Sequence, residues 1–123
     1  MKRILVVDDA ATVRLYHRNI LEAAGYTVEE AVNGIEALEK TLQAPFDLYV
    51  VDVNMPKLDG YGFLQELRGA DLPQAPAVMV STETADIDLQ RAYVAGANFY
   101  LIKPVKPDEL LRHARLLVGE ARP

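Results

Sequence analysis

Four apolar segments of this chain each end on polar residues that suit phosphate chemistry. The segments cover residues 3–7, 48–51, 77–80 and 99–102, and the polar residues that follow them are Asp8 with Asp9, Asp52, Ser81 and Lys103. Short runs rich in Val, Ile and Leu are typical of strands that are buried on both faces of a parallel sheet. The carboxyl ends of parallel strands meet at one edge of the sheet, where ligands bind. The sequence therefore predicts one site assembled from four distant stretches.

Segments with helical periodicity alternate with these runs, which is typical of successive βα units. We predict helices over residues 12–24, 34–44, 61–68, 85–95 and 107–118, and a more polar edge strand over residues 27–31. Right-handed connections and burial on both faces then favour the strand order 2-1-3-4-5. The predicted fold is α/β, a doubly wound five-stranded parallel sheet in a flavodoxin-like three-layer sandwich.

The length of the chain, 123 residues, is enough for a core on both faces of one sheet but not for two independent cores. We therefore expect a single domain over residues 1–123. The chain has no Cys and two His, so disulfides and thiolate metal sites are excluded. We expect both histidines, His17 and His113, to lie on helices away from the site.

The charge pattern narrows the class of partner. A net charge of −5 without a basic face argues against binding of nucleic acid. The apolar runs have the length of strands, and no signal peptide precedes them, so we expect a soluble, cytoplasmic protein that does not enter a membrane.

Asp8, Asp9 and Asp52 would bring three carboxylates to neighbouring strand ends. Like charges repel at this distance unless a cation relieves them. Mg²⁺ prefers oxygen ligands and usually keeps several waters, so two carboxylates and one backbone carbonyl would leave room for a phosphoryl oxygen. The acidic cluster therefore indicates a site for a hard divalent cation, Mg²⁺ or in its place Mn²⁺.

The remaining residue types at this edge fit phosphoryl transfer, which depends on positioning and on neutralising charge around three equatorial oxygens. Carboxylates form acyl phosphates, so Asp52 can act as the nucleophile once a metal has lowered the repulsion toward a phosphoryl group. Lys103 supplies a positive point charge and Ser81 a hydroxyl donor. We therefore predict that Asp52 accepts a phosphoryl group.

Taken together, these motifs resemble the receiver domain of bacterial two-component response regulators. The resemblance rests on Val6-Val7-Asp8-Asp9, on Asp52 with Asn54-Met55-Pro56 and Asp59-Gly60 behind it, on Ser81-Thr82, and on Lys103-Pro104. It covers essentially the whole chain, in order and at the usual separations. Each motif alone is weak, but the set is specific to that family.

The resemblance implies a role for each acidic residue. Asp52 would accept phosphate from the phosphohistidine of a histidine kinase. Asp9, Asp52 and the backbone carbonyl of Asn54 would bind Mg²⁺, and Asp8 would assist mainly through water. The family would also place a cis peptide before Pro104.

The resemblance also implies a signalling device. Ser81 and Lys103 would sense the phosphoryl group, and the aromatic residue three positions before the lysine, Tyr100, would swing into the space that the hydroxyl residue vacates. Asn54 and Glu83 occupy the positions at which family members tune the lifetime of the phosphoryl group.

The expected output surface comprises the fourth helix, fifth strand and fifth helix, with Leu89 and Tyr100 among the partner-binding residues. On the fourth helix we expect Leu89 at the surface and Tyr93 in the core. Because the chain resembles single-domain chemotaxis regulators of the CheY type, we expect a stand-alone receiver without an output domain that acts in motility or chemotaxis.

Such a protein is a switch rather than an enzyme, since it catalyses only its own phosphorylation and dephosphorylation. Its expected partners are a histidine kinase and a downstream protein such as the flagellar switch, and we expect it to act as a monomer. A phosphate sink or relay that drains a shared kinase is the alternative use of the same domain.

Three other functions place different demands on these residues. A phosphatase with an aspartyl nucleophile needs a second acid two residues after it, where this chain has Asn54. A flavodoxin-like cofactor site needs phosphate-binding donors in the first loop, where Asp8 and Asp9 would repel the anion. A receiver-like adaptor that binds partners without phosphorylation stays open as an alternative, although it has no need of the complete set of site residues.

Overall fold

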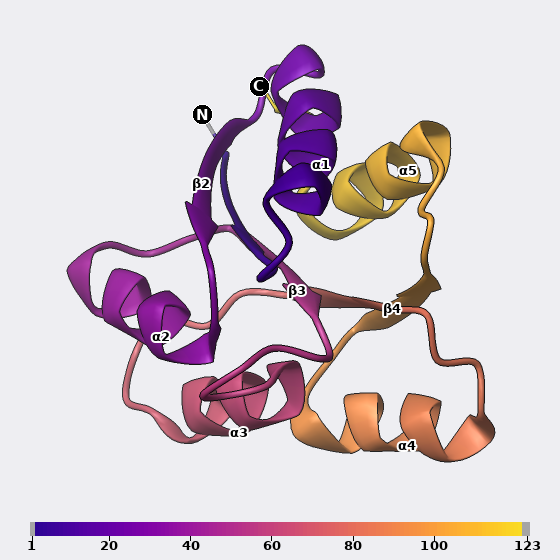
Figure 1. Cartoon of the computed structure of the whole chain (residues 1–123). Helices are drawn as coiled ribbons and strands as arrows, with labels where there is room; N and C mark the ends of the chain where they lie inside the picture. Colours follow the sequence, from indigo (N-terminus) through magenta and orange to yellow (C-terminus); the bar gives the residue numbers. More distant parts are fainter. Residues whose placement is uncertain (1, 122–123) are drawn as a thin grey trace.

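The computed structural model describes residues 2–121, which form one parallel sheet between two layers of helices (Figure 1). The strands are β1 (Arg3–Val7), β2 (Thr27–Ala31), β3 (Leu48–Asp52), β4 (Ala77–Ser81) and β5 (Phe99–Ile102). All four pairings are parallel, and the order is β2-β1-β3-β4-β5. The predicted fold class and strand order are therefore confirmed.

The helices lie close to their predicted positions. They are α1 (Ala11–Ala23), α2 (Gly34–Gln43), α3 (Gly60–Gly69), α4 (Asp86–Ala95) and α5 (Pro107–Val118). Helices α1 and α5 cover one face of the sheet, and α2, α3 and α4 cover the other (Figure 1). Within the part of the chain that is described, none of the helices is long and apolar enough to cross a membrane.

Local sequence signals explain where several helices begin and end. The side chain of Asn33 accepts a hydrogen bond from the backbone N–H of Glu36 and caps α2. The side chain of Asp59 accepts a hydrogen bond from the backbone N–H of Gly62 and caps α3. Helix α4 ends at Gly96, whose φ of 114° is a left-handed conformation that glycine adopts without strain.

Alternate residues of each central strand enter two separate cores, because side chains of a strand point to opposite faces in turn. Strands β3 and β4 are buried along their whole length. The core under α2, α3 and α4 contains Leu5, Val7, Tyr49, Val51, Ala77 and Met79. The core under α1 and α5 contains Ile4, Val6, Leu48, Val50, Val78 and Val80. This two-sided burial fixes the carboxyl ends of the strands in one row.

Gly60 allows the first turn of α3 to approach the end of β3 closely. Its N–H donates to the carbonyl of Val53, and a Cβ at this position would lie 2.3 Å from the carbonyl oxygen of Asp52. Any side chain here would therefore displace the backbone that carries Asp52. The Asp59-Gly60 motif thus serves as a helix cap followed by a close backbone contact.

Candidate functional site

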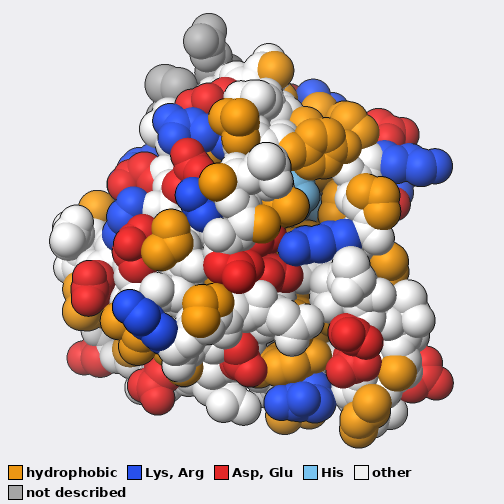
Figure 2. Space-filling view, in the orientation of Figure 1, with side chains coloured by type: hydrophobic (Ala, Val, Ile, Leu, Met, Phe, Trp, Pro, Cys, Tyr) orange, Lys and Arg blue, Asp and Glu red, His pale blue; other side chains and the backbone are white. Residues whose placement is uncertain are grey.

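The four polar strand ends converge as predicted. Asp8 follows β1, Asp52 ends β3, Ser81 ends β4 and Lys103 follows β5. The ammonium Nζ of Lys103 donates to Asp8 Oδ2 at 2.8 Å and to Asp52 Oδ1 at 2.9 Å. One lysine therefore bridges two carboxylates that lie on different strands. Acidic side chains gather near the centre of the face shown in Figure 2, at the edge where the strands end.

Burial sets the electrostatics of this cluster. Asp8 is 1% exposed and Asp52 5% exposed. Burial raises the pKa of Asp52, the hydrogen bond from Lys103 lowers it, and the charge of Asp8 raises it again, so the net shift is upward. For Lys103, burial opposes the charge, but the hydrogen bonds to Asp8 and Asp52 outweigh it and raise the pKa. Lys103 therefore stays protonated, whereas the ionised form of Asp52 is disfavoured.

The three carboxylates fit a divalent cation. Asp8, Asp9 and Asp52 each offer an oxygen, and these oxygens all lie within 4.8 Å of one another. Asp9 is exposed, so the cluster opens to solvent on its side. Three carboxylates against one ammonium leave the cluster negative, and hard oxygen donors of this kind are the ligands that Mg²⁺ prefers. The chemistry of the donor set therefore agrees with the predicted Mg²⁺ site.

The structure bears differently on three predicted details of this site. Asp8 is bound directly by Lys103, so its carboxylate is held in place before any metal arrives. Asn54 is exposed in the loop after β3, two residues beyond Asp52, and the role of its carbonyl as a ligand stays a prediction. The peptide bond between Lys103 and Pro104 is cis, as the resemblance implied.

A short hydrogen-bonded connection links the predicted sensor Ser81 to the predicted switch Tyr100. Ser81, which is buried, accepts a hydrogen bond at its Oγ from the N–H of Glu83 at 3.0 Å. The hydroxyl of Tyr100 donates to the carbonyl of Glu83 at 2.9 Å. Both residues therefore contact the backbone of the same residue in the loop between β4 and α4. Sequence reasoning placed Glu83 as a tuning residue but did not predict this bridging role.

The predicted partner-binding residues lie on two elements that contact one another, Leu89 on α4 and Tyr100 on β5. Tyr100 is half-buried against the core under α2, α3 and α4, and Leu89 is half-buried on α4. The prediction for Tyr93 is wrong, since its side chain is 49% exposed. Helix α4 buries small residues, Ala92 and Ala95, against the sheet, and this leaves the larger Tyr93 outside.

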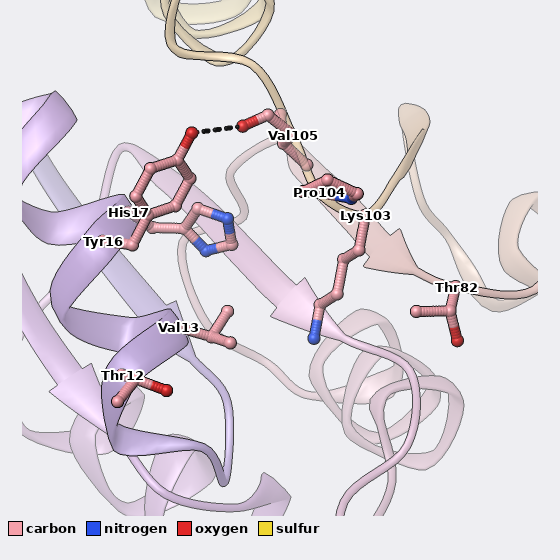
Figure 3. Close-up of a pocket in the computed structure, with 8 residues that line it drawn as sticks. All are labelled: Thr12, Val13, Tyr16, His17, Thr82, Lys103, Pro104 and Val105. Atoms are coloured by element: carbon pink, nitrogen blue, oxygen red, sulfur yellow. Dashed lines mark hydrogen bonds between the residues drawn. The ribbon is translucent and has the colours of Figure 1, made fainter.

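The expectation that His17 lies away from the site is also wrong. His17 is 2% exposed, and its ring lies between Tyr16 and Lys103 in a pocket of about 290 Å³ beside the acidic cluster (Figure 3). The pocket is lined by Thr12, Val13, Tyr16, His17, Thr82, Lys103, Pro104 and Val105. A signal was present in the sequence, because His17 is four residues after Val13 and four before Leu21 and shares their side of the helix.

The imidazole of His17 is neutral in this environment. Burial lowers its pKa, the charge of Asp8 opposes that shift and the charge of Lys103 adds to it, with a downward net result. Its Nδ1 has no hydrogen-bond partner among the described residues. The site therefore carries a buried base whose charging would place a second positive group near Lys103.

We predict that His17 makes the folded protein less stable as the pH falls below about 6.5. The unfolded chain takes up a proton on His17 near the ordinary pKa of 6.5, whereas the folded chain resists it. The contribution of neutral His17 to the free energy of unfolding is complete above pH 6.5. It is lost as the pH falls from 6.5 toward the lowered pKa of His17 in the folded protein. Unfolding by urea, without Mg²⁺, at several values from about pH 7.5 to about pH 5.5 measures this loss.

The His17→Val variant should show a shallower fall in unfolding free energy over this range than the natural protein. His113→Gln is the matched control, because His113 lies on α5 outside this pocket. The Nδ1 of His113 is hydrogen-bonded to the carbonyl of Glu109. Asp52 titrates in all three proteins, so its contribution cancels in the comparison. An unchanged pH dependence in His17→Val would show that His17 does not take part.

Known proteins match this chain over most of its length. A family model described as the response regulator receiver domain matches residues 4–115. The chain is 35% identical over 111 residues to chemotaxis protein CheY of Thermotoga maritima, covering 89% of this chain and 92% of that protein. It is 34% identical over 119 residues to transcriptional regulatory protein ResD of Bacillus subtilis, where it covers 97% of this chain. The chain spans about half of ResD, 49% of its length.

Solved structures give the same picture of the fold. A structure of chemotaxis protein CheY4 of Vibrio cholerae superposes with a TM-score of 0.89 at 36% identity, covering 95% of this chain and 98% of that one. A response regulator structure from Chloroflexus aurantiacus superposes with a TM-score of 0.91 at 32% identity, covering 97% and 98%. The match therefore extends over nearly the whole chain.

Proposed function

Since this chain belongs to the response regulator receiver domain family, we propose that it is a signalling switch in which Asp52 accepts a phosphoryl group from the phosphohistidine of a histidine kinase. One observation carries the proposal. The carboxylate of Asp52 lies in a buried cluster, hydrogen-bonded to Lys103 and within reach of two further carboxylates. A nucleophile, a cationic partner and ligands for a divalent metal thus meet at one point.

The chain's own residues prepare this reaction. Asp9 and Asp52, with the carbonyl of Asn54, would hold Mg²⁺, which when bound supplies the charge that lets an anionic phosphoryl group approach the carboxylates. An oxygen of Asp52 forms a bond to phosphorus as the phosphorus–nitrogen bond of the phosphohistidine breaks. The departing imidazole keeps the bonding electron pair and takes a proton from solvent. Lys103 neutralises the charge that arrives on Asp52.

The contacts of Glu83 support a route from Asp52 to the surface. The Oγ of Ser81 accepts a hydrogen bond, so the proton of this hydroxyl is free for a phosphoryl oxygen. Movement of Ser81 toward the phosphoryl group would release the N–H of Glu83, whose carbonyl holds the hydroxyl of Tyr100. Phosphorylation would thereby shift the population of a two-state element on the α4 and β5 surface.

Within the family, we place this protein among regulators of chemotaxis or motility, because it is 35% identical over 111 residues to chemotaxis protein CheY of Thermotoga maritima. It would act in the cytoplasm as a monomer that binds a downstream protein, such as the flagellar switch, in its phosphorylated form. It would not turn over a substrate as an enzyme does. A phosphate sink that drains a shared kinase is the alternative, and it requires no partner for the phosphorylated form.

The first test is intact mass after incubation with acetyl phosphate, with Mg²⁺ and with a chelator. We expect one phosphoryl adduct with Mg²⁺ and none with the chelator, since the acidic cluster repels the donor unless a cation is bound. Intact acetyl phosphate without an adduct would favour the adaptor that works without phosphorylation. Consumption of acetyl phosphate without an adduct would instead indicate rapid turnover.

A further inference from the structure

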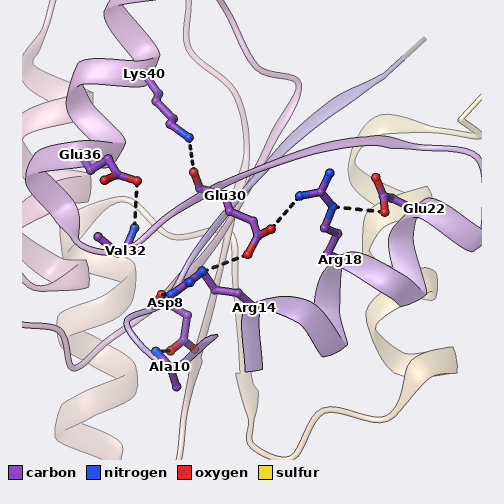
Figure 4. A network of polar contacts seen from close by, with 9 residues as sticks. All are labelled: Asp8, Ala10, Arg14, Arg18, Glu22, Glu30, Val32, Glu36 and Lys40. Atoms are coloured by element: carbon purple, nitrogen blue, oxygen red, sulfur yellow. Dashed lines mark hydrogen bonds and ion pairs between the residues drawn. The ribbon is translucent and has the colours of Figure 1, made fainter. Parts of the chain in front are cut away.

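A chain of ion pairs on α1 and β2 ends at the backbone of Asp8 (Figure 4). Glu22 pairs with Arg18 at 3.2 Å, and Arg18 pairs with Glu30 at 2.6 Å. Glu30 in turn accepts from Nε of Arg14 at 2.9 Å. A second nitrogen of Arg14, Nη1, donates to the carbonyl of Asp8 at 2.8 Å. The site described above does not explain this connection.

Arg14 fixes the point at which the chain leaves β1. The N–H of Asp8 donates to the carbonyl of Ala31 at 3.1 Å, and Asp8 Oδ1 accepts from the N–H of Ala10 at 2.9 Å. Together with the hydrogen bond from Arg14, Asp8 therefore has hydrogen bonds at its N–H, its side chain and its carbonyl. That carbonyl belongs to the peptide group that joins Asp8 to Asp9. Its orientation therefore sets the direction from which the carboxylate of Asp9 leaves the backbone.

Glu30 holds Arg14 in this position. Hydrogen bonds from Arg18 lower the pKa of Glu30, partial burial opposes the shift, and the hydrogen bond from Arg14 lowers the pKa further. Glu30 is therefore ionised at neutral pH. It lies near the carboxyl end of β2, where it is paired with Val6 of β1. Lys40 also donates to the carbonyl of Glu30. The edge strand thus provides an anchored carboxylate for the guanidinium.

The two arginines of this chain differ in what they contact. The side chain of Arg14 is 16% exposed and contacts both Glu30 and the Asp8 carbonyl. The side chain of Arg18 is 36% exposed, and its polar contacts within residues 2–121 are the carboxylates of Glu22 and Glu30. Exposed ion pairs of the second kind contribute little on their own. Arg14, by contrast, donates one of its two hydrogen bonds to the backbone at the site, the carbonyl of Asp8.

We propose that Arg14 is a positioning residue for the divalent cation, because it holds the backbone from which Asp8 and Asp9 present their carboxylates. This inference rests on the proposed function, since it requires a metal at the acidic cluster. Residues that orient metal ligands without touching the metal change its affinity by about 10- to 100-fold when they are replaced. Arg14 would act in this way through the Asp8 carbonyl.

The test is the affinity for Mg²⁺ alone, measured by isothermal titration calorimetry on the natural protein and on the Arg14→Gln and Arg18→Gln variants. Both variants lose an ion pair with Glu30, but only Arg14→Gln loses the contact to Asp8. We expect Arg14→Gln to bind Mg²⁺ at least about 10-fold more weakly than the natural protein. Arg18→Gln should stay within about twofold, because an exposed pair contributes little.

A second readout separates positioning from general destabilisation. Amide resonances of residues 8–10, recorded without metal, should shift in Arg14→Gln and stay in place in Arg18→Gln. Unfolding in urea should show a small loss for both variants. Should Arg14→Gln fail to fold, Glu30→Gln carries the test, because it removes the anchor of Arg14 and leaves Arg14 itself. A greater loss of Mg²⁺ affinity in Glu30→Gln than in Arg18→Gln supports the inference.

Equal Mg²⁺ affinities for the natural protein and Arg14→Gln, or equal losses in Arg14→Gln and Arg18→Gln, would overturn the role of Arg14. That result would leave the proposed function intact. A natural protein that binds no Mg²⁺ would contradict the proposed function first, and this inference with it. The two failures are therefore distinguished by the natural protein alone.

Discussion

Asp52→Asn is expected to abolish the phosphoryl adduct and, at the same time, to stabilise the metal-free protein. The amide of Asn has no carboxylate oxygen to attack phosphorus, so the intact mass should not change with acetyl phosphate and Mg²⁺. Burial and the nearby charge of Asp8 hold the pKa of Asp52 above its ordinary value. A neutral side chain of the same shape relieves that cost, so the variant should unfold at a higher temperature at neutral pH.

Asp59→Asn is the matched control for this substitution. Asp59 lies seven positions after Asp52 in the sequence but caps α3 and stands outside the acidic cluster. Asn caps helices about as well as Asp, so we expect Asp59→Asn to retain both the adduct and the stability of the natural protein. An adduct on Asp52→Asn would assign the phosphoryl group to another residue. A lower unfolding temperature of Asp52→Asn would contradict the argument that the buried charge of Asp52 destabilises the metal-free protein.

Lys103→Met is expected to destabilise the metal-free protein by roughly 3 kcal/mol, the usual size for removing one partner of a buried ion pair. The loss arises because Asp8 and Asp52 would then face one another without the ammonium that bridges them. Mg²⁺ should restore much of the stability, since it neutralises the same carboxylates. Lower pH should also reduce the loss, because protonation of Asp52 removes one of the two charges. Urea unfolding with and without Mg²⁺ measures these effects.

Two further variants isolate the cause of that loss. Lys103→Met combined with Asp52→Asn should recover stability relative to Lys103→Met alone, because only one buried carboxylate remains. Lys106→Met removes an exposed lysine three residues further on, one that makes no ion pair among the described residues. It should change stability by less than about 0.5 kcal/mol. Equal losses in Lys103→Met and Lys106→Met would show that the bridge does not stabilise the fold.

The strands and the row of polar groups at their ends were predictable from the sequence for a simple physical reason. Strands buried on both faces must be apolar along their length, so Asp8, Asp52 and Lys103 mark where each apolar run ends. In a parallel sheet every such stop falls on the same edge. The site could therefore be located from the strand ends before any contact was known. The residue-by-residue roles came from the family resemblance and not from this pattern.

Contacts that depend on the rotation of a helix or on the backbone were not predictable in this way. The sequence predicts Tyr93 in the core, whereas the structure buries the smaller Ala92 and Ala95 of α4 and leaves Tyr93 outside. It predicts His17 away from the site, whereas the rotation of α1 buries His17 beside Lys103. The bond from Arg14 to the carbonyl of Asp8 uses a main-chain acceptor, which carries no sequence signal of its own. The bridge through the backbone of Glu83 was missed for the same reason.

The lysine bridge has a consequence for synthesis of the protein on the ribosome. Lys103 is 95 positions from Asp8 and 51 from Asp52, so both acids are translated long before their cation. A nascent chain that stops before β5 carries Asp8, Asp9 and Asp52 without the lysine that neutralises them. Such a chain would gather negative charge at the edge of an unfinished sheet. Arrival of Lys103 completes the charge balance, so the site at which we propose phosphorylation is assembled only after β5 has been made.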